Sequence, residues 1–61
     1  MNREEILNMI ACHRIQIQAL KLQRNEECKL IKGEQHDMIA KDYNDDIKAY
    51  INDIKELQGK L

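Results

Sequence analysis

Each half of this 61-residue chain carries a row of apolar or bulky residues at alternating spacings of four and three. The rows are Ile6, Ile10, His13, Ile17, Leu20, Arg24, Cys28 and Ile31, and then His36, Ala40, Tyr43, Ile47, Tyr50, Ile54, Leu57 and Leu61. Residues at this spacing share one helix face, as in a coiled coil. We call these two rows together the seam. Folding the chain back between the rows aligns them from Ile6 opposite Leu61 to Arg24 opposite Tyr43. The seam therefore predicts an all-α, antiparallel two-helix hairpin with coiled-coil-like packing.

Capping signals indicate where the two helices begin and end. Asn2 is a good N-cap, and Glu5 three residues later completes the pattern of a capping box. Gly33 fits the position just after a helix, where a left-handed residue stops it. Asp37 is the expected N-cap of the second helix. The sequence thus predicts one domain over residues 1–61, with a helix over about 3–32, a turn over about 33–36 and a helix over about 37–58.

The first predicted helix carries a second apolar row, which we call the outer stripe. At 100° per residue, Ile15 and Leu22 point nearly opposite to Ile17 of the seam. One hairpin cannot bury both sides of this helix, and a large exposed apolar patch usually marks an interface. A chain this short also buries little surface alone, which favours oligomerisation. We therefore expect two hairpins to form a homodimeric four-helix bundle through a dimer or partner interface made of Leu7, Ala11, Ile15, Ala19 and Leu22.

Charge is nearly balanced over the whole chain but differs between its halves. The net charge of −1 is typical neither of a strongly basic nucleic-acid-binding protein nor of a disordered acidic tail. Residues 1–32 contain six Lys or Arg against four Asp or Glu, and residues 33–61 contain four against seven. Opposite charges on packed helices favour the antiparallel arrangement weakly. The alternative is an incidental imbalance between two solvated faces.

The residue types argue against catalysis and metal binding. The chain has no serine or threonine, which removes hydroxyl nucleophiles and the phosphate-binding P-loop pattern. Cys12 and His13 are neighbours on a helix and do not face each other, and no ligand spacing typical of zinc occurs. Cys12 and Cys28 lie about 24 Å apart on the predicted helix, too far for a disulfide. We expect a protein without enzymatic activity, cofactor or metal, with reduced thiols or, alternatively, a disulfide between subunits.

Two polar residues interrupt the seam of the first helix. His13 is expected to be an interface histidine near Tyr50, where burial disfavours its charged form and makes acidification destabilising. Arg24 is expected to stack on the Tyr43 ring or to pair with an acidic residue of the second helix. Its stem covering the seam, with the charge in solvent, is the alternative.

A basic strip on the first helix offers a different function. Its members are Arg14, Lys21, Arg24, Lys29 and Lys32. Two such strips in a dimer would be able to track nucleic-acid phosphates. In size and layout the chain resembles plasmid copy-number regulators of the Rop type, which are helical hairpins that dimerise into four-helix bundles and bind RNA. The resemblance is architectural, shares no residue motif, and implies an RNA-binding dimer as the alternative function.

Together these patterns predict a small non-enzymatic regulatory or adaptor protein that binds a second copy of itself, with another protein as a further candidate partner. A short chain that begins at its own Met is typical of bacteriophage and plasmid accessory genes. No apolar run approaches the roughly 20 residues of a membrane span, and the N-terminus lacks the pattern of a signal peptide. We therefore expect a cytoplasmic location and no membrane partner.

Overall fold

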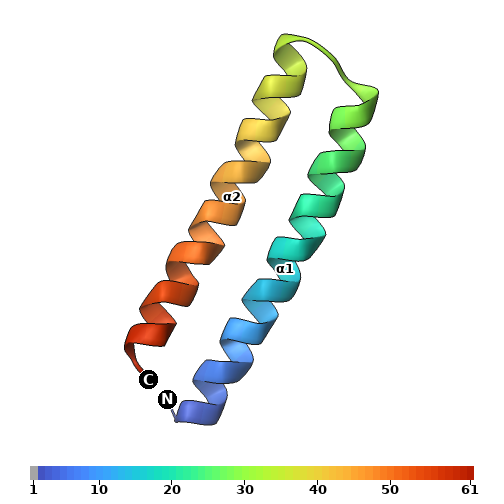
Figure 1. The fold of residues 1–61 in the computed structure, drawn as a ribbon. Helices are drawn as coiled ribbons and strands as arrows, with labels where there is room; N and C mark the ends of the chain where they lie inside the picture. Colours follow the sequence, from blue (N-terminus) through green and yellow to red (C-terminus); the bar gives the residue numbers. More distant parts are fainter. Residues whose placement is uncertain (1) are drawn as a thin grey trace.

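The structure is a computed structural model that describes residues 2–61, and it consists of two packed helices. Helix α1 spans Arg3–Leu30 and helix α2 spans Glu34–Gly59. They run antiparallel along a molecule 46 Å long, with both chain ends at the same end (Figure 1). The predicted all-α helical hairpin is confirmed.

The start of α1 follows the predicted capping pattern. The Asn2 side chain accepts a hydrogen bond from the backbone N–H of Glu5 at 2.8 Å. This bond satisfies one of the backbone donors that a helix start leaves free. Glu4 and Glu5 also lie in the first turn, where carboxylates stabilise the positive end of the helix dipole.

The turn differs from the prediction at both of its ends. Helix α1 stops at Leu30, and Ile31 takes an extended conformation. Helix α2 begins at Glu34, so the connection is residues 31–33 rather than 33–36. Gly33 is the N-cap of α2, and its φ of 82° and ψ of −148° form a backbone conformation that is essentially open only to glycine.

The predicted N-cap role of Asp37 is therefore wrong. The chain reverses at Gly33 and enters α2 at once, which places Asp37 inside the first turn of the helix. There its backbone N–H donates to the Gly33 carbonyl at 3.4 Å. Its carboxylate, with that of Glu34, lies at the positive end of the helix dipole.

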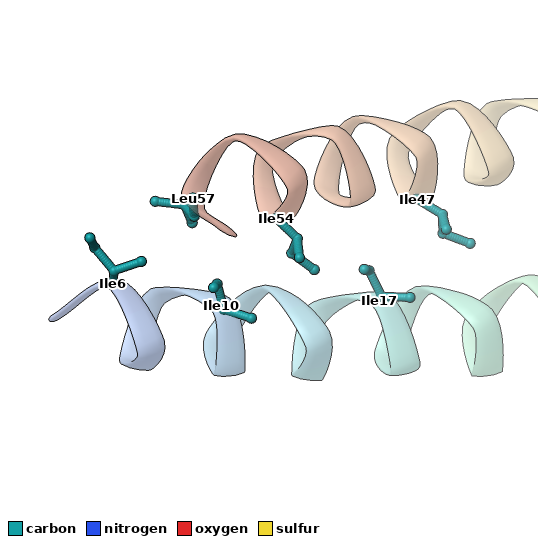
Figure 2. Packing of buried hydrophobic residues seen from close by; sticks show 6 residues of the cluster. All are labelled: Ile6, Ile10, Ile17, Ile47, Ile54 and Leu57. Carbon is teal, nitrogen blue, oxygen red and sulfur yellow. The ribbon is translucent and has the colours of Figure 1, made fainter. Parts of the chain in front are cut away.

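The end of α2 also changes one predicted contact. The helix continues to Gly59, and the Lys60 N–H donates to the Leu57 carbonyl at 3.1 Å. Leu61 lies beyond the helix and is 51% exposed. Figure 2 shows Leu57 at a level between Ile6 and Ile10. The seam therefore ends at Leu57.

The core consists entirely of seam residues. The buried set is Ile6, Ile10, Ile17, Ile47, Ile54 and Leu57, and Leu20 and Tyr50 pack against it. Figure 2 shows Ile54 at a level between Ile10 and Ile17, as the predicted register requires. Within residues 2–61, the side chains that are buried or half-buried are the seam residues up to Leu57 together with Ile39. The predicted packing faces are therefore confirmed.

This core occupies the half of the hairpin that carries the chain ends. Seam residues nearer the turn are only half-buried, namely Arg24, Cys28, Ile31, His36, Ala40 and Tyr43. Arg24, His36 and Tyr43 among them carry polar groups. The two halves of the hairpin thus differ in how much apolar surface they remove from water.

Candidate interaction surface

The outer stripe lies on the face of α1 turned away from α2 and remains in solvent. Ile15 is 67% exposed, Leu22 64% and Leu7 45%, and the two alanines between them, Ala11 and Ala19, are also exposed. A helix in a two-helix hairpin has only one neighbour, so its opposite face has nothing to pack against. The residues predicted as a dimer or partner interface therefore form one accessible apolar surface.

Helix α2 has no equivalent surface. Its large exposed apolar residues are Met38 near the turn and Ile51, which is only 39% exposed. The rest of its exposed face is mostly charged or amide side chains, as expected of a simple amphipathic helix. Surplus apolar surface is therefore concentrated on α1.

The ends of the outer stripe carry opposite charges. By helical position, Glu4 continues the stripe at the start of α1 and Lys29 continues it at the end, and both are exposed. Glu26 lies on the same side near Lys29, and Arg14 borders the stripe near its middle. The stripe is therefore an apolar surface with an acidic end and an end that contains a lysine.

The predicted basic strip does not form one line in the structure. Arg14 and Lys21 are exposed and seven residues apart, so they share a face of α1. Arg24 is half-buried against α2, Lys29 is at a helical position that continues the outer stripe, and Lys32 lies outside the helix. Only two of these cations share an open face.

Arg24 is held by amides rather than by the predicted tyrosine or carboxylate. Its guanidinium donates to the Asn44 side-chain oxygen of α2 at 2.6 Å and to the Asn25 side-chain oxygen at 3.4 Å. The seam indicated that Arg24 faces the second helix near Tyr43. The seam did not indicate that the Arg24 guanidinium would bind the residue after Tyr43, Asn44, because the repeat does not set the direction of a side chain.

His13 occupies its predicted place but has an unforeseen neighbour. Its ring meets the Tyr50 ring edge-on, with the ring centres 5.3 Å apart and an interplanar angle of 66°. Its Nε2 also lies 4.0 Å from a carboxylate oxygen of Asp53. Asp53 precedes Ile54, the residue predicted to face His13, so the sequence contained a signal for it.

The pKa of one tyrosine is raised by a glutamate of the other helix. Hydrogen bonding to Glu27 of α1 raises the pKa of Tyr43 on α2 above its usual value of 10.0, and burial and the negative charge of Glu27 act in the same direction. A neighbouring carboxylate stabilises the protonated phenol and disfavours a second negative charge. This pair was not anticipated from the seam.

The described part of the chain has the features of neither a metal site nor a membrane span. Residues 2–61 contain no cluster of three or more metal-ligating side chains, and neither of their helices has enough consecutive apolar residues to cross a bilayer. Cys12 is exposed, Cys28 is half-buried, and both are free thiols. Two open hollows follow one another along the helix contact, and Asp53 borders both of them.

Comparisons with protein families, characterised proteins and solved structures give no match to this chain. Its function is therefore inferred from its own surfaces.

Proposed function

We propose that this protein is a small non-enzymatic regulator or adaptor that acts by binding proteins through the outer stripe of α1. The observation that carries the proposal is the exposure of Ile15 and Leu22 on a helix whose other face is already buried. Removing apolar surface from water stabilises a complex by roughly 25 cal/mol per Å². A contiguous apolar surface of this kind supports an interaction role.

The proposal includes self-association. Two hairpins that cover each other's outer stripes form a homodimeric four-helix bundle with the two α1 helices in contact. This assembly removes the largest exposed side chains of the stripe from water. It also supplies the additional core that a chain of 61 residues lacks on its own.

A capture experiment with matched variants tests the proposed function. Ile15→Glu places a charge in the stripe, and Met38→Glu makes the same change at an equally exposed residue of α2, since both residues are 67% exposed. We expect wild type and Met38→Glu to retain the same protein partner, identified by mass spectrometry and then measured with purified components. Ile15→Glu should weaken that binding at least about tenfold while circular dichroism shows an intact hairpin. Equal binding by both variants would contradict the proposal.

Nucleic-acid binding is the competing function and draws on Arg14 and Lys21. These two exposed cations share a face, but Arg24 is engaged by Asn44 and gives them less support. Phosphate contacts make affinity fall steeply with salt. Salt-dependent RNA binding that disappears in the Arg14→Gln, Lys21→Gln double variant would favour this function over the protein-binding role.

A further inference from the structure

We infer that the outer stripe binds a second copy of this chain in antiparallel orientation, with the two Ile15 side chains meeting on the twofold axis. The inference rests on the proposed function, because it uses the same stripe, and it specifies the partner, the orientation and the register.

The order of residue sizes along the stripe is nearly symmetric about Ile15. An alanine lies four residues before it and another four residues after it, and a leucine lies eight before and another seven after. In a twofold interface, a residue that contacts a second one is contacted in return by its equivalent. Antiparallel docking about Ile15 satisfies this condition because Ala11 faces Ala19 of the second copy. The facing alanines let the helices approach closely, and the leucines pack at both ends of the contact.

The charges at the ends of the stripe select the antiparallel orientation over the parallel one. In the antiparallel dimer Glu4 of each copy lies opposite Glu26 of the other, since both are eleven residues from Ile15, and Lys29 of the other copy lies within about one helical turn of Glu4. Parallel docking instead sets Glu4 beside Glu4 and Lys29 beside Lys29, and like charges repel. Glu26 meets a carboxylate in either orientation, so the position of Lys29 decides. Antiparallel helix dipoles contribute in the same direction.

The direction of the stripe also sets the arrangement of the four helices. At 100° per residue the outer stripe and the seam lie roughly 160° apart around α1. In a four-helix bundle with a square cross-section, the two faces by which one helix contacts its neighbours lie closer to about 90° apart. The dimer is therefore a flattened four-helix bundle, with α2 of each copy outside and the two α1 helices in the middle. Arg14 borders the stripe at the edge of this layer and extends into solvent.

Disulfide trapping with introduced cysteines tests orientation and register. In a background of Cys12→Ser and Cys28→Ala, one chain carries Ala11→Cys and another carries Ala19→Cys. Mixing the two chains under mild oxidation should give the mixed disulfide, because the two positions face each other in the antiparallel dimer. Each chain alone should cross-link at least about tenfold more slowly, since eight residues separate the positions by about 12 Å along the helix, beyond disulfide reach. Cross-linking of either chain alone as fast as in the mixture would overturn the antiparallel register.

Sedimentation of the unmodified chain tests the self-partner separately. We expect wild type and Met38→Glu to be dimers, and Ile15→Glu to raise the dimer dissociation constant at least about 100-fold, because it sets two carboxylates against each other on the axis. A wild-type monomer at concentrations up to about 100 µM would overturn the inference. The proposed function would survive that result if Ile15→Glu still abolished capture of a different protein. Dimerisation of Ile15→Glu equal to that of wild type would contradict both.

Discussion

Ile15 and Ile17 are the same residue type, lie two positions apart on α1, and have opposite surroundings. Ile17 is 8% exposed and packs against α2, whereas Ile15 is 67% exposed and faces solvent. The difference comes from direction around the helix alone, since the two positions point roughly 160° apart. The inner face of α1 thus maintains the hairpin, and the outer face is available for a partner.

The largest expected effect separates the two isoleucines directly. Ile17→Ala should lower the free energy of unfolding by about 2–4 kcal/mol, because it leaves a cavity in the core. Ile15→Ala should change it by no more than about 0.5 kcal/mol in the monomeric hairpin. Denaturation followed by circular dichroism at low protein concentration measures both. If Ile17→Ala does not fold, Ile17→Val should still show a loss of about 0.5–1.5 kcal/mol. Equal losses at the two positions would contradict the comparison.

The inner face should also depend on the chain reversal at Gly33. Gly33→Ala should cost about 1–3 kcal/mol, because the backbone conformation with φ of 82° is strained for any residue with a Cβ. Gly59→Ala is the matched control, since open space surrounds both glycines and only Gly33 has a positive φ. The control should be neutral or stabilising by up to about 1 kcal/mol. Thermal melts measure the stability of both variants. If Gly33→Ala were as stable as Gly59→Ala, the turn would adopt another conformation.

The polar part of the inner face should contribute less than its apolar part. A double-mutant cycle between Arg24→Met and Asn44→Ala should give a coupling energy of about 0.5–1.5 kcal/mol, the usual net value of a hydrogen bond. Methionine retains most of the arginine stem and so limits the loss of packing. The same cycle between Arg14→Met and Asn44→Ala should give no coupling, because Arg14 is exposed away from α2. Equal coupling in both cycles would show that the contact measured is not this hydrogen bond.

The smallest expected effect concerns Tyr43 and appears only at high pH. Its raised pKa means that the unfolded chain loses the phenol proton first as pH rises above the usual value of 10.0. The contribution of Tyr43 to stability is therefore complete below that pH and is lost as pH rises through the pKa of the folded state. Tyrosinate absorbance measures this titration, and Tyr43→Phe leaves only the signal of Tyr50. Glu27→Gln should move the midpoint of Tyr43 down towards the usual value, and an unchanged midpoint would assign the shift to burial instead.

The sequence predicted the helix faces well because burial in a hairpin follows the helical repeat. The repeat placed Ile6, Ile10 and Ile17 on the inner face of the first helix and Ile54 and Leu57 on the inner face of the second, and all five are buried. It also placed Ile15 on the opposite, exposed face. Such faces are fixed by residue spacing, which a sequence contains directly.

The turn and the polar partners were harder to predict because they depend on backbone angles and side-chain directions. Gly33 carries a signal for the end of the first helix and Asp37 a signal for the start of the second, whereas the structure has Gly33 itself as the N-cap of α2, with a φ of 82°. Likewise, the repeat brought Arg24 to α2 but did not distinguish Asn44 from its neighbours as an acceptor. Whether a second copy covers the outer stripe depends on a molecule outside the hairpin, so the sequence yields that contact only as a proposal.

The position of the core at the end opposite the turn has a consequence for folding kinetics. The residues that Figure 2 shows packed together come from segments about 30 to 50 positions apart in the chain, so the loop between them must close before their burial is gained. A hairpin with its core beside the turn would fold by forming contacts between residues close in sequence first. Here the contacts close to the turn are half-buried and partly polar. This arrangement predicts that folding is rate-limited by a long-range encounter of the two helices, and that local opening of the native state begins where the chain reverses.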